Sequence, residues 1–258
     1  MHEAAVRTNL PITVTKFDER VLLLHDRITY KRMSTPQDME AVHRLRYDAY
    51  VRARMIDKDD GGDAAGQRGW SDDYDRDPNC YNMAVYHEDR MLGCIRIHVA
   101  DRAHQRMPST KHIPDYISEW LAEGHTLVDC SRFSHVDKLP GYLKLLPFAT
   151  LRLTCMACVH FDADYSVQVV QKKHAGFYQN QLHSEFLEDR NIGFDNGKPF
   201  FASVLRADVR LMRVLAFQER AHLLSLPSER EALFGSKDSG FVKPTARRVI
   251  EDGEESGI

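Results

Sequence analysis

The sequence lacks a long apolar run. No segment approaches the roughly 20 consecutive apolar residues that a membrane-spanning helix needs, and no such run follows the start of the chain at 1–9, where a signal peptide would lie. Leu22-Leu23-Leu24 is too short to serve as one. We therefore expect no integral membrane segment and a cytoplasmic location.

A basic excess is also missing. The formal net charge is −3, whereas nucleic-acid-binding proteins usually carry a strong positive charge, so we expect no nucleic-acid partner. The composition, 43% hydrophobic and 28% charged, is that of an ordinary globular protein. The chain is long enough for one large domain with a real core.

Cysteine is scarce and unevenly placed. Five cysteines in a chain without a signal segment do not indicate a disulfide framework. The Cys155-Met156-Ala157-Cys158 pair has no second cysteine pair for zinc, and Val159 stands where a haem-attachment motif needs histidine. Both cysteines lie on a helical apolar stripe with Phe148 and Leu151, so we predict core residues and no metal site.

The chain is predicted to be a single α/β domain with a mixed sheet. We expect a lead-in segment at 1–27, the domain at 28–225 and a polar C-terminal tail at 226–258. The expected strands are 28–33, 81–86, 91–99, 126–136, 165–170 and 200–205. One helix is expected to begin at Pro36, and three further helices are expected over 113–121, 147–161 and 174–189. A turn is expected at Asn196-Gly197.

Two local patterns are specific. Thr35, Pro36 and Asp38 form a helix start in which threonine caps and proline occupies the first turn. The Asp- and Gly-rich stretch 57–77 is predicted to be a long loop, and loops of this length in a compact domain are usually functional or disordered.

Charged residues interrupt two apolar strands. Arg96 lies on the strand face shared by Cys94 and His98, and Asp129 and Arg132 lie three apart in another strand. A charge inside a sheet must be paired or face a pocket. Residues three apart point to opposite faces of a regular strand, so a β-bulge near Ser131 is the hypothesis that would place Asp129 and Arg132 on one face.

Four charged motifs in order resemble one enzyme family. They are Arg44-Leu45-Arg46-Tyr47-Asp48-Ala49-Tyr50, Asp72-Asp73-Tyr74-Asp75, Gly93-Cys94-Ile95-Arg96-Ile97 and Asp129-Cys130-Ser131-Arg132-Phe133. Together they span about residues 40–137. The chain is similar to the autoinducer-synthase branch of the GNAT-like N-acyltransferases, which includes acyl-homoserine-lactone synthases and long-chain N-acyl amino acid synthases.

This resemblance implies a GNAT-like acyltransferase fold with a splay or bulge in the central strand. It implies a charge network in which Arg46, Asp72, Asp75 and Arg96 order the loop and shape the acceptor site. It also assigns Ser131 and Phe133 to the substrate-binding strand and Arg132 to that strand's arginine. Asp72, Asp75, Arg46 and Arg96 could instead act structurally by clamping the loop. Asp129 and Arg132 could be only a buried structural pair.

Three departures from the family pattern bear on the acceptor. Asp129 stands where the family usually has glutamate, Ile56 stands where a tryptophan is expected, and the loop to Trp70 is long. These departures favour an amino acid as the acceptor. The alternative is an acyl-homoserine-lactone synthase that uses S-adenosylmethionine.

The donor is predicted from a missing motif. After Val136 the chain has Lys138-Leu139-Pro140-Gly141-Tyr142 in place of the GNAT pyrophosphate loop. An acyl carrier protein that presents a phosphopantetheine thioester therefore fits better than free acyl-CoA, and no permanently bound cofactor is expected. Carrier proteins are acidic, and the candidate docking residues, which could also be an ordinary solvated surface, are Lys138, Lys144, Arg152, Lys172 and Lys173.

The expected reaction is attack of an amine on the acyl thioester. Asp129 is the candidate base, directly or through a water. Backbone N–H groups at the bulge could hold the oxyanion, and Arg132 or Arg96 could bind the acceptor carboxylate. Tyr178, in a segment that resembles the GNAT helix with a tyrosine near the thiol, could protonate the leaving group or simply be a core residue.

Three other functions remain open on sequence alone. A CoA-dependent acetyltransferase is disfavoured by the missing loop. A non-catalytic carrier-binding or ligand-sensing module on the same fold is mildly disfavoured by the intact charged motifs. A Cys-His hydrolase built on Cys130 lacks a sharp nucleophile turn.

Overall fold

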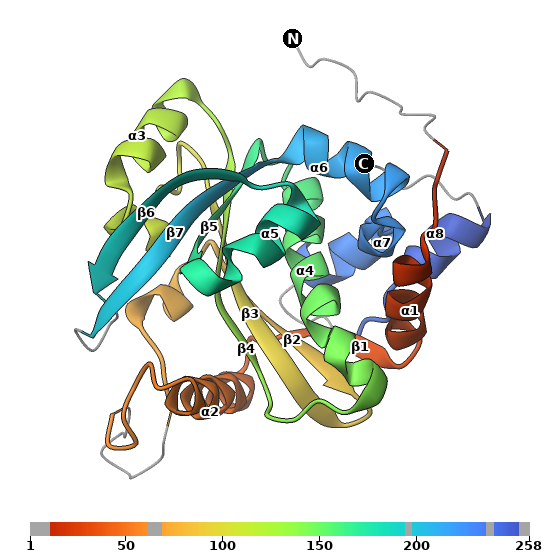
Figure 1. Ribbon diagram of the computed structural model, residues 1–258, viewed down its shortest axis with the longest axis horizontal. Helices are drawn as coiled ribbons and strands as arrows, with labels where there is room; N and C mark the ends of the chain where they lie inside the picture. The colour runs from red at the N-terminus through yellow and green to blue at the C-terminus, as the bar shows by residue number, and fades with distance from the viewer. Residues whose placement is uncertain (1–10, 61–68, 194–197, 236–239, 253–258) are drawn as a thin grey trace.

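A seven-stranded mixed sheet forms the centre of the protein, shown by a computed structural model that describes residues 11–60, 69–193, 198–235 and 240–252 (Figure 1). The strands are β1 (Ile28–Arg32), β2 (Cys80–His87), β3 (Arg90–Ala100), β4 (Leu127–His135), β5 (Tyr165–Gln171), β6 (Glu185–Gly193) and β7 (Pro199–Asp208). Their order is β1-β2-β3-β4-β5-β7-β6, and only β4 and β5 pair in parallel. The predicted α/β class with a mixed sheet is confirmed.

Helices cover both faces of the sheet (Figure 1). They are α1 (Lys16–His25), α2 (Pro36–Arg52), α3 (Pro114–Glu123), α4 (Leu146–His160), α5 (Ala175–Leu182), α6 (Val209–Gln218), α7 (Pro227–Arg230) and α8 (Ala246–Asp252). The alternation of side chains along the strands separates two faces: α2 and α3 pack on one, and α4 packs with α1, α5 and α6 on the other.

The central helix α4 is almost entirely core. Gly141–His160 is the one stretch among the described residues that is long and apolar enough to cross a membrane, and 67% of it is buried inside the protein. Cys155 and Cys158 are buried free thiols on this helix, as predicted. No group of side chains suited to a metal ion occurs within the described ranges.

Strands β4 and β5 pair over only three residues. The pairs run from Leu127 with Tyr165 to Asp129 with Val167, after which the two strands diverge. On its other side β4 carries the predicted bulge, because Arg96 faces Ser131 while Cys94 faces Ser134. Arg132 within the bulge has a left-handed backbone with φ of 56°. The splay and the bulge therefore lie side by side in β4.

One predicted helix was too long. The segment expected as a helix over 174–189 ends as α5 at Leu182, and His183 follows with φ of 51°. The chain then forms β6, an edge strand whose residues are mostly exposed or half-buried. The turn predicted at Asn196-Gly197 lies outside the described residues.

Described segments near both ends of the chain contribute to the core, which corrects the expected lead-in at 1–27 and polar tail at 226–258 where the structure describes them. Val21 and Leu24 of α1 are fully buried in the main cluster. Leu233, Phe234 and Val249 are buried in the same cluster. Here the apolar residues form short runs that are flanked by charged ones, which is why the sequence resembles a solvated segment.

Candidate active site

A network of three arginines and two aspartates joins α2, β3 and β4. The Arg46 guanidinium donates to both Asp75 oxygens at 2.8 and 2.9 Å and to Asn82 Oδ1 at 2.6 Å. Arg96 donates to Asp72, to Asp75 at 3.2 Å and to Ser131 Oγ at 3.1 Å. Arg132 also donates to Asp72. The residues assigned by resemblance to a charge network are thus in direct contact.

The network holds a short turn against the sheet. Asp72 caps the 3-10 helix η1 (Asp73–Arg76) by accepting the Tyr74 N–H at 3.0 Å. Burial disfavours the charged form of Asp72, but hydrogen bonds and charge from Arg96 and Arg132 outweigh it and lower its pKa to about 2. Burial is likewise outweighed at Asp75, whose pKa is held well below its usual value by His43, Arg46 and Arg96.

Asp129 stands apart from this network. Its side chain is 1% exposed, and Oδ2 accepts the backbone N–H of Ser109 at 2.8 Å. No ion pair links Asp129 to a cation among the described residues, so the alternative of a buried Asp129–Arg132 pair is not what forms. Burial raises the pKa of Asp129, partly offset by the Ser109 hydrogen bonds. A buried carboxylate of this kind is well suited to accept a proton.

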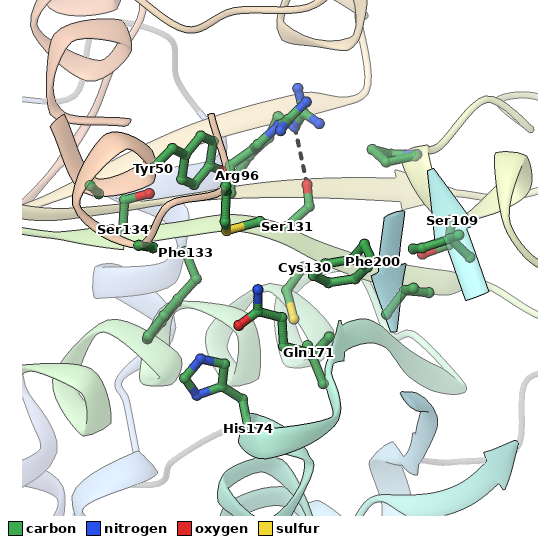
Figure 2. Close-up of a pocket in the computed structure, with 18 of the residues that line it drawn as sticks. Tyr50, Arg96, Ser109, Cys130, Ser131, Phe133, Ser134, Gln171, His174 and Phe200 are labelled. Carbon is green, nitrogen blue, oxygen red and sulfur yellow. Dashed lines mark hydrogen bonds between the residues drawn. The ribbon is translucent and has the colours of Figure 1, made fainter. Parts of the chain in front are cut away.

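A cavity of about 610 Å³ lies where β4 and β5 diverge. It reaches both faces of the sheet, because Asp129 and Ser131 line it from the face covered by α2, and Phe133 and Phe177 line it from the face covered by α4. In Figure 2 the Arg96 and Ser131 side chains lie on one side of β4, and Gln171 and His174 lie on the other.

The two halves of the cavity differ in chemistry. On the α2 face the lining is polar and charged, with Arg96, Ser131, Arg132 and Asp129. On the α4 face the lining includes the aromatic rings of Phe133, Phe177 and Tyr178. Phe177 packs against Phe148 at 5.3 Å and against Phe133 at 6.3 Å between ring centroids. The cavity therefore offers a polar site and an apolar site that meet at the bulge.

Tyr178 lines the apolar half. Its side chain is 5% exposed, and its hydroxyl has no hydrogen-bond partner among the residues described. Burial raises the pKa of Tyr178 well above its ordinary value, so the phenol keeps its proton at neutral pH. The geometry is that of a donor available to a ligand.

The predicted carrier-docking residues do not form one set. Arg152 is fully buried in α4 and pairs with Glu229 at 2.5 Å, so its assignment to a docking surface was wrong. Lys172 is exposed and pairs with Asp189 at 2.5 Å. Lys138, Lys144 and Lys173 are exposed, and Lys173 lines the mouth of the cavity.

Several residues of the site were missed from sequence. Ser109 and Lys111 belong to the 3-10 helix η2 (Pro108–Lys111), which no periodic pattern announced. Tyr74 and His135 also line the cavity, and burial lowers the pKa of His135 to about 4. Tyr74 follows Asp72-Asp73, so that acidic motif was the available signal for it.

Trp70 packs in one cluster with Ile56, which stands where the family pattern has a tryptophan. It is 9% exposed and packs with Ile56 and Tyr50 in one cluster, its ring 6.4 Å from that of Tyr50. The backbone N–H of Trp70 donates to the His43 carbonyl of α2 at 3.0 Å. Ile56 and Trp70 therefore both pack in the cluster that contains Tyr50, and Tyr50 lines the cavity.

The family model described as "N-acyl amino acid synthase FeeM" matches residues 41–200, well over half of the chain. This chain belongs to the FeeM N-acyl amino acid synthase family. The matched span contains all four charged motifs and both cavity strands. The protein is an N-acyltransferase of this family. No curated protein sequence matches the chain significantly.

Solved structures agree on the fold. FeeM, an N-acyl amino acid synthase from uncultured soil microbes, aligns with a TM-score of 0.56 at 16% identity, over 73% of this chain and 94% of its own. The acyl-homoserine-lactone synthase LasI gives 0.51 at 17%, over 74% and 93%. TofI, solved with an inhibitor and MTA, gives 0.52 at 13%, over 76% and 99%. The expected GNAT-like, autoinducer-synthase-like fold is confirmed.

Proposed function

We propose that the protein transfers a medium or long acyl chain from acyl carrier protein to the α-amine of an amino acid. The observation that carries this proposal is the cavity beside the β4 bulge. Its polar half contains the buried Asp129, which forms no ion pair with a described residue, and its apolar half has aromatic side chains. One half suits a charged acceptor and the other suits an acyl thioester.

The acceptor amine binds beside Asp129. Because Ser109 occupies Oδ2, the other carboxylate oxygen is available to the amine or to a bridging water. An ammonium ion there would supply the positive partner that Asp129 lacks among the described residues. Asp129 then takes a proton from the amine, and the freed nitrogen lone pair attacks the thioester carbonyl carbon.

The β4 bulge supports the carbonyl oxygen. Beyond Asp129 the edge of β4 that faces β5 has no strand partner, and Arg132 and Phe133 fall between the ladder pairs of β3. Backbone N–H groups in such a place can hold the oxyanion of the tetrahedral intermediate. As the carbon–sulfur bond breaks, Tyr178 supplies a proton to the thiolate, and the second proton on the attacking nitrogen passes to the resulting tyrosinate or to solvent as the amide forms. Asp129 then releases its proton to solvent.

The donor arm enters from the face that carries α4 and α5. Lys173 at the cavity mouth and the exposed Lys138 and Lys144 are a reduced version of the expected docking set, without Arg152 and Lys172, which pair with Glu229 and Asp189. The absence of the pyrophosphate loop after Val136 favours a phosphopantetheine arm over free CoA. An acidic carrier protein would be attracted to these lysines.

The test is a reconstituted assay. Purified protein is mixed with acyl carrier protein loaded with acyl chains of different lengths, and each mixture receives an amino acid, S-adenosylmethionine or no acceptor. Mass spectrometry then identifies the product. We expect an N-acyl amino acid and faster turnover with carrier protein than with acyl-CoA. An acyl lactone, or turnover with acetyl-CoA alone, would overturn the proposal.

A further inference from the structure

The polar half of the cavity is lined by two arginines and a lysine that differ in their contacts. Arg96 and Arg132, the residues first considered for the acceptor carboxylate, both donate to Asp72, and Arg96 also reaches Asp75. Their positive charge is therefore already paired with the aspartates of the η1 turn. Lys111 lines the same cavity, is exposed to solvent, and forms no ion pair with any described residue.

Lys111 is placed by the turn that contacts Asp129 and by the ring of Tyr74. It is the last residue of η2, and Ser109 in the same turn donates its N–H to Asp129 at 2.8 Å. Its Nζ lies 4.9 Å from the centroid of the Tyr74 ring, in a cation–π contact. Tyr74 also lines the cavity, and burial raises the pKa of its hydroxyl, with smaller contributions from the charges of Asp72 and Asp129.

A second polar group points to a ligand here. The Tyr74 side chain is only 8% exposed, and its hydroxyl has no hydrogen-bond partner in the part of the chain that the structure describes. The hydroxyl is not sealed from solvent, so it can hydrogen-bond a ligand in the cavity that Tyr74 lines. Tyr74, Lys111 and Asp129 thus offer a hydroxyl, a cation and an anion around one space.

We propose that Lys111, positioned by the ring of Tyr74, binds the α-carboxylate of the acceptor and so selects amino acids over amines without a carboxylate. The inference rests on the proposed function. An α-amino acid carries its ammonium and carboxylate groups on one carbon atom. With the amine at Asp129, the carboxylate falls toward Lys111 and the Tyr74 hydroxyl, where an ammonium–carboxylate hydrogen bond can form.

The experiment compares each amino acid with its carboxamide, which keeps the side chain and the amine but loses the negative charge. In the wild-type protein kcat/KM should be higher for the acid. Lys111→Met should lower kcat/KM for the acid about tenfold to a hundredfold, the worth of a hydrogen bond to a charged group, and leave the carboxamide almost unchanged. Lys111→Glu should turn the preference toward the carboxamide.

Lys243→Met is the matched control. Lys243 is also exposed, and its neighbour Val242 pairs with Tyr30 of β1, an edge strand separated from β4 by β2 and β3. The control should keep the wild-type ratio of acid to carboxamide. Equal losses for acid and carboxamide in Lys111→Met would overturn the role of Lys111. Failure of the wild-type protein to acylate either acceptor would instead overturn the proposed function.

Discussion

At the scale of single residues, burial raises the pKa of Asp129, the proposed base. Asp129→Asn keeps the shape and can still accept the Ser109 N–H, but it cannot take a proton. We expect kcat to fall about 10²- to 10⁴-fold. The wild-type rate should fall with decreasing pH through the pKa of Asp129, which lies above its ordinary 3.8, and acyl-transfer rates over a pH series measure both effects.

The same substitution should not weaken the fold. The pKa of Asp129 is raised in the folded protein, so its ionised form opposes folding: this cost is absent at pH values below 3.8 and grows as pH rises through the folded pKa. At neutral pH, Asp129→Asn should therefore unfold at the same or a higher temperature. A large loss of thermal stability would show that Asp129 is structural, and undiminished turnover would exclude it as the base.

Asp72 has the opposite linkage. Its pKa is lowered to about 2, so its contribution to stability is present above 3.8 and is lost as pH falls through about 2. Asp72→Asn leaves Arg96 and Arg132 without that charge, and we expect a loss of about 3 kcal/mol. Urea unfolding at neutral pH measures it.

The control for Asp72 is Asp73→Asn in the same turn, because Asp73 makes no ion pair with any residue in the described ranges. It should leave the free energy of unfolding nearly unchanged. If the two variants unfolded at the same urea concentration, the network would not be what holds η1.

At the scale of elements, the β4 bulge depends on one unusual backbone conformation. Arg132 has φ of 56°, which glycine adopts freely and alanine does not. Arg132→Gly and Arg132→Ala both remove the guanidinium, so their difference isolates the backbone. We expect the glycine variant to be more stable by about 1 kcal/mol, measured by chemical unfolding; the reverse order would mean that the bulge relaxes in the variants.

Elements with strong local signals were predictable from the sequence. The cap of α2 forms as Thr35 and Asp38 indicated. The β2–β3 hairpin was predicted by the alternation of apolar and polar residues, and the bulge was predicted by the charged residues inside an apolar strand. The end of α5 was not predictable in this way, because β6 is an exposed edge strand with charged residues on both faces. Thr15 and Asp18 form a capping box at α1, so the sequence contained a signal for this helix, which was not predicted.

The site was predictable only where its residues lie on regular strands. Arg96, Asp129 and Arg132 stood out as charges in apolar runs. Lys111 and Ser109 lie in a short turn with no pattern of its own, so their place beside Asp129 arises from tertiary packing alone. Arg152 was misassigned because Glu229, its partner, is 77 residues away along the chain.

At the scale of the whole molecule, the Arg152–Glu229 pair ties the C-terminal region to the central helix. Both side chains are fully buried, and Thr245 donates to Glu229 at 2.5 Å. Glu229→Ala leaves a buried guanidinium without its counter-charge, and we expect a loss of about 3 to 5 kcal/mol, measured by thermal and urea unfolding.

The double variant Arg152→Met, Glu229→Leu is the matched control. It replaces both charges with apolar side chains of similar size, and such replacements are often neutral. It should recover most of the stability lost in Glu229→Ala. A double variant as unstable as the single one would assign the loss to the Thr245 and Leu224 contacts instead of the unpaired charge.

The divergence of β4 and β5 has a kinetic consequence. The cavity has exposed lining residues on both sides of the sheet, with Ala53 and Lys111 on one side and Lys173 and His174 on the other. Two molecules that approach from opposite sides do not obstruct each other's path. Neither has to wait for the other, and this is the geometric condition for a random order of substrate binding.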